Sequence, residues 1–192
     1  MPAPTRTRTP LSTADARRDT VITSAIQVFA TSGYLGTPIA AVAEHARISP
    51  AYVFKLFPGK ETLFVAALDR CFELIEESLA RGAEESAGQT PSEILSAMGG
   101  AYAELIEDRA LLLLQVHAQS AGEIPEIGDS LRRGLARVTR FALDRSGATD
   151  GEVQRFMAFG QLCHLIVTAG LESIPEDWAR ILTDGIRHPQ TR

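Results

Sequence analysis

The fold is decided by residues 37–64, which read TPIAAVAEHARISPAYVFKLFPGKETLF. Early in this stretch Ile39, Val42 and Ala43 recur at spacings of three and four residues, which predicts a helix rather than a strand. A second apolar set repeats this spacing before a proline–glycine pair ends it. Two helices this short cannot bury a core alone, so the stretch predicts a helix-turn-helix that neighbouring helices support.

Start signals precede both short helices. Ser49 before Pro50 predicts an N-cap followed by proline in the first turn, where a missing N–H costs little. Thr37 before Pro38 gives the same signal for the earlier helix. The exposed N–H groups and the positive end of the helix dipole at Thr37 predict a phosphate contact there.

The composition is that of a globular protein, with 45% hydrophobic and 22% charged residues in 192. Its apolar runs are too short to span a bilayer, and the basic N-terminus has no apolar segment behind it, so we expect no membrane association and no secretory signal. Cys71 and Cys163 fit no disulfide or metal spacing. We therefore expect a cytoplasmic protein with two reduced cysteines, no metal and no cofactor.

The charge is unevenly distributed along the chain. Residues 1–60 hold seven basic and three acidic residues, a net charge of +4, so the rest must carry −9 to give the overall −5. A basic end on an acidic chain predicts that the N-terminal part meets a polyanion while the remainder repels it.

Helical periodicity continues through the rest of the chain, and no segment alternates convincingly as a strand does. Besides the two short helices we expect helices over 13–32, 60–81, 91–107, 109–121, from a break at 122–125 to 145, over 150–169 and from Ser173 onward, so the fold class is all-α with about nine helices. Gly33 should end the first helix, and Tyr34 and Leu35 should fold beneath the next two. Residues 82–89 are expected to be a loop.

Three parts of the chain are expected. Residues 1–12 should be a disordered basic tail, residues 13–60 a helix-turn-helix DNA-binding domain, and residues 61–192 a helical effector-binding and dimerisation domain. The segment 150–169 is apolar nearly all round, which predicts burial on more than one side.

The stretch from Arg17 to Leu68 resembles the DNA-binding domain of the TetR family of bacterial transcriptional regulators. The matching elements, in the family's order, are Gly33-Tyr34, Thr37, Val42-Ala43, Ala46-Arg47-Ile48-Ser49, Phe54-Lys55-Leu56-Phe57 and Lys60-Glu61-Thr62-Leu63. The resemblance implies a homodimer that pairs through its last two long helices, the eighth and ninth, and binds a near-palindromic DNA operator. It also implies a repressor released by a small molecule, although repression and activation cannot be told apart from these residues.

Two residues depart from the family pattern. Arg47 stands where glycine is usual, so a turn that needs a positive φ would cost about 1 kcal/mol unless the guanidinium gains a phosphate contact. Phe54 replaces a tyrosine that touches phosphate in relatives, and we expect it only to pack.

The predicted DNA-facing residues lie on the second short helix and at helix starts. Tyr52 is expected to contact bases and Lys55 a guanine or a phosphate, whereas Val53 and Phe57 face inward. The full set is Thr37, Arg47, Ser49, Pro50, Ala51, Tyr52, Lys55 and Lys60. Arg17 and Arg18 are expected to be solvated surface residues.

The predicted effector site lies in a mainly apolar interior, so we expect a largely apolar small molecule of unknown identity. Its candidate residues are Met98, Tyr102, Gln115, His117, Phe141 and Phe159.

Two other classes of function fit the sequence less well. An all-α enzyme would need a catalytic motif, and the chain contains no GxSxG, HExxH, CxxC or GxxxxGK[ST] sequence. Cys163 and His164 are adjacent, so they point about 100° apart on a helix and do not form a nucleophile–base pair. A helical interaction protein without a DNA role would leave the basic N-terminal part unexplained. The sequence therefore favours a DNA-binding regulator that is not an enzyme.

Overall fold

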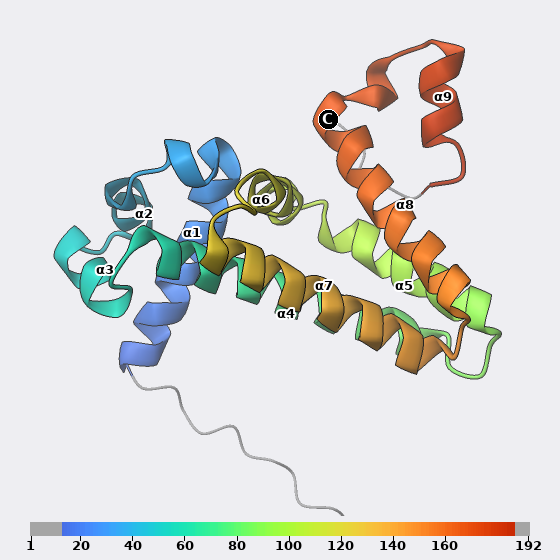
Figure 1. Ribbon diagram of the computed structural model, residues 1–192, viewed down its shortest axis with the longest axis horizontal. Helices are drawn as coiled ribbons and strands as arrows, with labels where there is room; N and C mark the ends of the chain where they lie inside the picture. The colour runs from blue at the N-terminus through green and yellow to red at the C-terminus, as the bar shows by residue number, and fades with distance from the viewer. Residues whose placement is uncertain (1–12, 187–192) are drawn as a thin grey trace, which may run out of the picture.

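The computed structural model describes residues 13–186, so the predicted disordered tail, residues 1–12, lies outside the described residues. The described chain is helical throughout, which confirms the all-α prediction (Figure 1). Its elements are α1 (Thr13–Gly36), α2 (Ile39–Ala46), α3 (Pro50–Leu56), α4 (Lys60–Glu85), α5 (Pro91–Leu105), α6 (Arg109–Ser120), α7 (Pro125–Ser146), α8 (Asp150–Ala169), a 3₁₀ turn η1 (Leu171–Ser173) and α9 (Asp177–Thr183).

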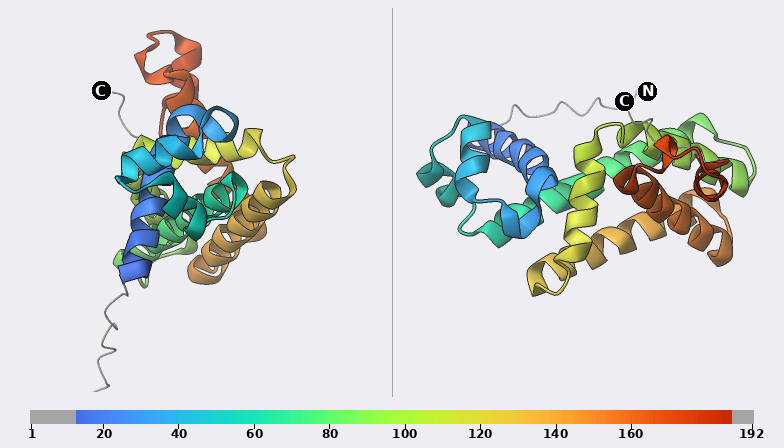
Figure 2. Two further views of the ribbon diagram at one scale, coloured as in Figure 1. Left: turned by 90° about the vertical axis from the view of Figure 1, so that its left-hand side faces the viewer. Right: turned by 90° about the horizontal axis from the view of Figure 1, so that it is seen from above.

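The helices form an elongated molecule with α1, α2 and α3 at one end (Figure 1). We call these three helices the head and the remaining ones the body. Helices α4 and α7 run side by side along the body, and α5 and α8 lie at its far end. Helix α6 crosses between the head and α8, as the view from above shows (Figure 2), and packs against α1. No helix within residues 13–186 is both long and apolar enough to cross a membrane.

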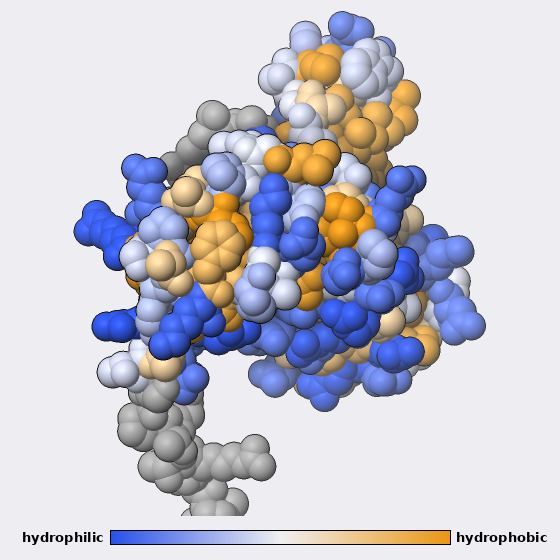
Figure 3. Space-filling model, turned by 60° about the vertical axis from the view of Figure 1, so that its left-hand side comes forward, coloured by the Kyte–Doolittle hydropathy of each residue, from blue (hydrophilic) through white to orange (hydrophobic). Residues whose placement is uncertain are grey.

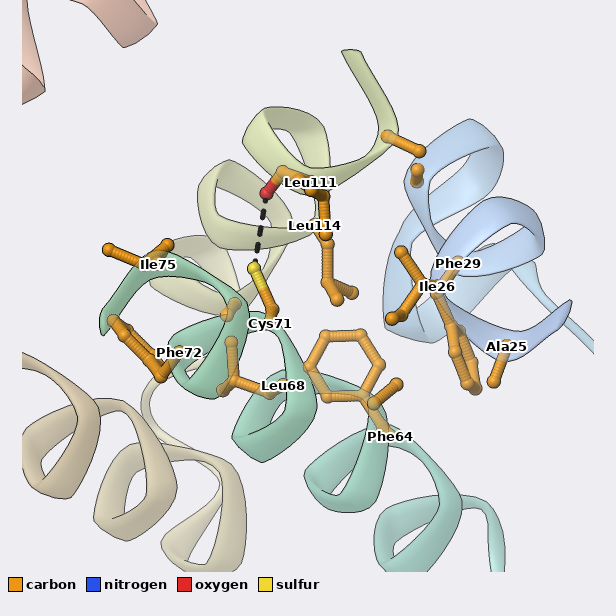
Figure 4. Close-up of a cluster of buried hydrophobic side chains, with 14 of the residues drawn as sticks. Ala25, Ile26, Phe29, Phe64, Leu68, Cys71, Phe72, Ile75, Leu111 and Leu114 are labelled. Atoms are coloured by element: carbon orange, nitrogen blue, oxygen red, sulfur yellow. Dashed lines mark hydrogen bonds between the residues drawn. The ribbon is translucent and has the colours of Figure 1, made fainter. Parts of the chain in front are cut away.

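One hydrophobic core joins the head to the body. Side chains of α1, α4 and α6 point into a common cluster (Figure 4), in which the rings of Phe29 and Phe64 meet edge to face at 4.9 Å. Within it, Cys71 is fully buried and its Sγ donates to the carbonyl oxygen of Leu111 at 3.5 Å. Burial raises the pKa of the Cys71 thiol to about 12, so the thiolate is absent at neutral pH. This agrees with the expected reduced cysteine. The boundary between domains at residue 60 stays a prediction.

The expected stop near residue 82 was wrong, because α4 continues to Glu85. Gly82 is a point of close approach rather than a stop: a β-carbon there would lie 2.6 Å from the carbonyl oxygen of Ala97 on α5. Glycine therefore lets α4 and α5 touch through their backbones.

The end of α1 is kinked at Gly33, which has φ 66° and ψ −175°, a conformation that side chains other than glycine rarely adopt. Helical turns resume after it and reach Gly36. Tyr34 is buried, as expected, but Leu35 is 85% exposed, so the prediction that both fold beneath the next helices was wrong for Leu35.

Capping boxes begin two of the long helices. Thr90 forms one at the start of α5, and Thr149 forms one at the start of α8. The last helix differs, because the chain makes the short turn η1 where a helix was expected from Ser173, and α9 begins only after the N-cap residue Glu176.

Candidate functional site

Helix α3 is the shortest exposed helix of the head, and its start is built as the sequence predicts. The hydroxyl of Ser49 accepts a hydrogen bond from the N–H of Tyr52 at 3.3 Å, and Pro50 occupies the first turn. The first residues of α3 are therefore exposed, and the cap holds their backbone in the helical conformation.

The turn between α2 and α3 depends on Arg47. This residue has φ 56° and ψ 40°, and among residues 13–186 it is the one non-glycine with a positive φ. The backbone N–H groups of Arg47 and Ile48 donate to the carbonyl oxygens of Glu44 and Ala43 at 3.0 Å each, which satisfies the end of α2. The turn therefore does need a positive φ, which is the condition under which arginine was expected to cost stability here.

The exposed face of α3 carries four of the predicted DNA-facing residues. Ser49, Pro50, Ala51 and Lys55 are exposed, and Tyr52 is half-buried. The inward residues are as expected, since Val53 and Phe57 are buried.

Phe54 contradicts the expectation that it only packs. Its side chain is 52% exposed, beside Lys55 on the outer face of α3. An aromatic ring in this position is available to whatever binds the face, and apolar contact with a thymine methyl group is one contact that a major groove offers.

Two arginines of α1 brace α3, whereas the sequence indicated mere solvation. Arg18 donates to the carbonyl oxygen of Leu56 at 2.9 Å, and its guanidinium carbon lies 4.2 Å from the centre of the Phe57 ring. The guanidinium of Arg17 lies 5.5 Å from the centre of the Tyr52 ring. A cation near the last carbonyls of α3 complements the negative end of the helix dipole. These contacts could not be predicted from the sequence, because they join residues far apart in the chain.

The start of α4 holds the link between α1 and α2 in place. The ammonium of Lys60 donates to the carbonyl oxygens of Thr37, at 3.1 Å, and Leu35, at 3.4 Å, and lies 4.7 Å from the centre of the Tyr34 ring. The hydroxyl of Tyr34 donates to Glu61 at 2.5 Å. This bond holds the pKa of Glu61 below its usual value, and burial, together with the carboxylate, raises the pKa of Tyr34 to about 12.

Thr37 is buried just before the start of α2. Its side chain is buried, 2% exposed, and its hydroxyl oxygen has no hydrogen-bond partner among the described residues. The N-cap of α2 is Pro38, not Thr37, so the expected cap was wrong. The hydroxyl is therefore not available to a phosphate, and the carbonyl oxygen of Thr37 accepts from Lys60. The phosphate contact expected through N–H groups at this helix start stays a prediction.

The body contains a cavity of about 390 Å³ between α4, α5, α7 and α8. Of the predicted effector residues it brings together Tyr102, Gln115 and Phe159. The remaining lining residues, which are mostly apolar and which the sequence did not single out, are Phe72, Ile75, Leu79, Ser92, Leu95, Ser96, Gly99, Gly100, Leu135, Val138, Glu152, Arg155, Phe156, Met157, Gly160, Gln161, Cys163, Gly185 and Ile186.

The other three predicted effector residues lie elsewhere. Met98 is fully buried and does not line the cavity, and Phe141 lies by a shallow, arginine-rich depression on α7. His117 faces the head, where its Nε2 is 3.2 Å from the carbonyl oxygen of Ala30. These three residues do not line this cavity, and their role in binding an effector stays a prediction.

A hydrogen-bonded group of neutral side chains lies at one part of the cavity wall. The hydroxyl of Tyr102 is 2.8 Å from Nε2 of His164 and receives a hydrogen bond from Nε2 of Gln115 at 3.2 Å. Burial lowers the pKa of His164 to about 4. It raises the pKa of Cys163 to about 11, and it also raises the pKa of Tyr102 well above its usual value. At neutral pH this wall therefore carries no charge. Within the described part of the chain, no group of three or more His, Cys, Asp or Glu residues could hold a metal ion.

Comparison with known proteins places the head in a family. The family model described as "Bacterial regulatory proteins, tetR family" matches residues 21–67. The HTH-type transcriptional repressor KstR of Mycolicibacterium smegmatis is 30% identical over 128 residues, which span 63% of this chain and 62% of that protein. KstR of Rhodococcus jostii is 27% identical over 191 residues, spanning 91% of this chain and 86% of its own.

The fold of the whole chain is also similar to solved structures. One is the transcriptional regulator FadR of Bacillus subtilis in complex with stearoyl-CoA, with a TM-score of 0.65 at 13% identity over 85% of this chain and 92% of that one. At this identity the likeness concerns the fold alone. The match to KstR of M. smegmatis spans less than two thirds of that protein's length.

Proposed function

The chain belongs to the TetR family of bacterial regulatory proteins, and we propose that it is a sequence-specific DNA-binding repressor that a small molecule releases from a near-palindromic operator. The observation that carries the proposal is the exposed face of α3, held outward by the Ser49 cap and braced from behind by Arg18. A helix presented in this way suits a major groove.

Within this proposal the residues of α3 divide by role. Tyr52 and Phe54 offer rings to base edges and thymine methyl groups, whereas Lys55 and Arg47 offer charge to phosphates or guanine. Bidentate contacts to adenine require asparagine or glutamine. The chain contains no asparagine and α3 contains no glutamine, so we expect no such contact from this helix. Lys60 is a further phosphate candidate, provided that its bonds to the carbonyl oxygens of Leu35 and Thr37 leave one N–H free.

The test is a mobility-shift assay on DNA upstream of the protein's own gene. Tyr52→Ala should weaken binding to the specific operator much more than to random DNA, because a base contact discriminates between sequences. Lys55→Ala serves as the comparison, and if it contacts phosphate it should weaken both alike and lower the salt dependence. Equal losses on both DNAs with Tyr52→Ala would remove Tyr52 from sequence readout, and no shift by the folded wild type at low salt would contradict the repressor function.

We propose that two copies pair through α8 and α9. Among the large apolar side chains that the described chain exposes, Phe159 and Leu165 lie on α8 and Trp178 and Ile181 on α9. Hydrophobic residues gather on this upper part of the surface in Figure 3. A surface of this kind indicates a protein interface. Leu165→Glu combined with Ile181→Glu should convert the dimer to a monomer in light-scattering measurements, and an unchanged mass would place the interface elsewhere.

The cavity is the proposed effector site. Its lining is mostly apolar, as suits a largely apolar molecule, and the similar fold of FadR from B. subtilis was solved with stearoyl-CoA. Helix α6 offers a route to the head, because Gln115 lines the cavity and His117 contacts α1 on another side of the same helix. An effector must bind the DNA-free conformation more tightly, and about 5.5 kcal/mol of difference moves occupancy from 99% to 1%.

We further propose that the chain has no catalytic role and works in the cytoplasm, where the DNA of a bacterium lies. Cys163 is the nearest approach to a nucleophile beside a histidine, but burial keeps its thiol protonated, with a pKa of about 11. The adjacent His164 bonds to Tyr102 instead. An all-α enzyme or a DNA-independent interaction protein remains the alternative that the mobility-shift assay tests.

A further inference from the structure

The cavity wall around Tyr102 can offer a ligand only certain hydrogen-bond donors and acceptors. The bonds that Gln115 makes inside the protein determine which of its atoms remains free. Nε2 of Gln115 donates to the carbonyl oxygen of Leu111 at 3.1 Å and to the hydroxyl of Tyr102 at 3.2 Å. A carbonyl oxygen only accepts, so the amide atom that faces Leu111 must be the nitrogen. Both N–H groups of Gln115 are thereby used inside the protein. Its amide oxygen is left as an acceptor, on a residue that lines the cavity.

The tautomer of His164 determines whether the Tyr102 hydroxyl is free to donate to a ligand. Its Nδ1 is buried without a hydrogen-bond partner among the described residues, and the residue is 4% exposed. A buried N–H without a partner is rarer in proteins than a buried acceptor without one. The proton therefore resides on Nε2, which donates to the oxygen of Tyr102 at 2.8 Å.

With this tautomer the oxygen of Tyr102 accepts from both His164 and Gln115, and its own proton has no acceptor within the group. Tyr102 lines the cavity. The wall thus presents one donor, the Tyr102 hydroxyl, next to one acceptor, the Gln115 amide oxygen. A ligand group that satisfies both must itself accept and donate.

The charges around the cavity further restrict which ligand groups can bind at this wall. The four side chains at this wall, those of Tyr102, Gln115, Cys163 and His164, are neutral at pH 7. Among the cavity-lining residues the cation is Arg155, and Glu152 lies near it in sequence. Arg155 lies two turns of α8 before Cys163, a rise of about 12 Å. A carboxylate or ammonium at the Tyr102 wall would therefore be buried without a counter-ion, at a large cost.

We propose that the cavity selects an uncharged amphiphile, a mainly apolar molecule whose hydroxyl group binds Tyr102 and Gln115. This inference rests on the proposed function for its biological meaning, since the molecule would be the effector. It does not rest on that function for its chemistry, which concerns binding alone.

Matched decyl compounds test the selectivity on the full-length protein by isothermal titration calorimetry at pH 7.5. The probes are 1-decanol, its methyl ether, decanoate and decylamine, which share one chain and differ in the polar end. We expect 1-decanol to bind most tightly. The ether lacks the donor and leaves the Gln115 oxygen unpaired, so it should bind about tenfold more weakly. The two ions should bind more weakly than the ether.

Two variants assign the atoms. Tyr102→Phe removes the donor and should weaken both 1-decanol and the ether, by about tenfold each. Gln115→Met removes the acceptor and should abolish the advantage of 1-decanol over the ether without weakening the ether to the same degree. Gln27→Met, which replaces a half-buried glutamine of α1 that is bonded to Asp108 and lies outside the cavity lining, is the matched control and should retain the wild-type order.

The proposal is overturned if decanoate or decylamine binds as tightly as 1-decanol, if the ether equals the alcohol in the wild type, or if 1-decanol does not bind up to its solubility. A mobility-shift assay with 1-decanol distinguishes the binding of a hydroxyl compound from its role as an effector that releases DNA. Binding in the expected order without release of DNA supports the hydroxyl site and contradicts the proposed effector role of this cavity. Absence of any DNA binding, with the order intact, contradicts only the repressor function.

Discussion

The imidazole of His117 lies directly against Gly33: a β-carbon at residue 33 would be 2.8 Å from Nδ1 of His117. Nε2 of the same ring is 3.2 Å from the carbonyl oxygen of Ala30, to which it donates. The kink of α1 and the C-terminal half of α6 are therefore fitted to each other. Movement of α6 must be accompanied by movement of the head or by loss of this contact.

Gly33→Ala should destabilise the protein for two separable reasons. The backbone conformation at residue 33 is nearly exclusive to glycine and should cost about 1–3 kcal/mol with alanine, and the new methyl group meets His117 as well. Urea denaturation measures the sum. Adding His117→Ala to Gly33→Ala removes the steric part and leaves the backbone part, so the double variant should lose less than the two single losses added together. Additive losses would show that the ring and the glycine are independent.

Arg47→Gly should stabilise the fold. Arginine in the left-handed conformation, φ 56° here, costs about 1 kcal/mol relative to glycine, although the greater freedom of glycine in the unfolded chain offsets part of the gain. We expect a net increase of up to about 1 kcal/mol in the free energy of unfolding. Arg47→Ala keeps the strained backbone and should show no such increase.

The same pair of variants tests the charge of Arg47. If the guanidinium contacts phosphate, both variants should lose DNA affinity equally, on specific and random DNA. A loss confined to Arg47→Gly would instead assign the effect to the backbone of the turn.

Phe54→Tyr should strengthen DNA binding without changing stability. The ring is 52% exposed, so the added hydroxyl meets solvent in the free protein. At a DNA surface a hydroxyl donates to phosphate, and one such bond corresponds to about fivefold in affinity on any sequence. Titration of a labelled duplex at fixed salt measures the change. An unchanged affinity would mean that the edge of this ring faces away from the phosphates.

His164 should make the protein less stable as the pH falls. Its pKa is about 4 in the folded state and 6.5 for an ordinary histidine, so the unfolded chain gains the proton first. The contribution is complete above pH 6.5 and is lost as the pH falls toward 4. Between pH 7 and pH 5 the free energy of unfolding should fall by about 2 kcal/mol on this account.

The control for this prediction is His164→Gln, which retains a donor for Tyr102 but does not titrate. The carboxylates contribute equally to both proteins, so the difference between their pH profiles isolates the histidine. Parallel profiles from pH 7 to pH 5 would show that the imidazole is hydrated in the folded state.

The sequence predicted best what is set within a few residues. The cap at Ser49 is confirmed, and the capping boxes of Thr90 and Thr149 and the left-handed turn at Arg47 are local features of the same kind. The all-α fold follows from periodicity, which needs no knowledge of partners. A local rule failed at Gly82, because a glycine that permits close packing has the same letter as one that ends a helix.

The parts that could not be predicted depend on distant residues. Gln115 and His117 are close in sequence but point about 200° apart on a helix, and only the position of α1 decides that one faces the cavity and the other the head. The burial of Thr37 and the bracing of α3 by Arg18 likewise need the tertiary arrangement. Effector residues were therefore harder to assign than residues of α3, whose exposed face is defined by its own apolar pattern.

The hydrogen bonds of Lys60 lower the entropy cost of binding an anion at this side chain. Its ammonium is held by the carbonyl oxygens of Leu35 and Thr37, so the long side chain is already ordered before any partner arrives. Immobilising a free lysine takes up to about 2 kcal/mol of rotamer entropy. Here folding has largely met that cost, so the proposed phosphate contact at the start of α4 would be made by a cation that is already ordered.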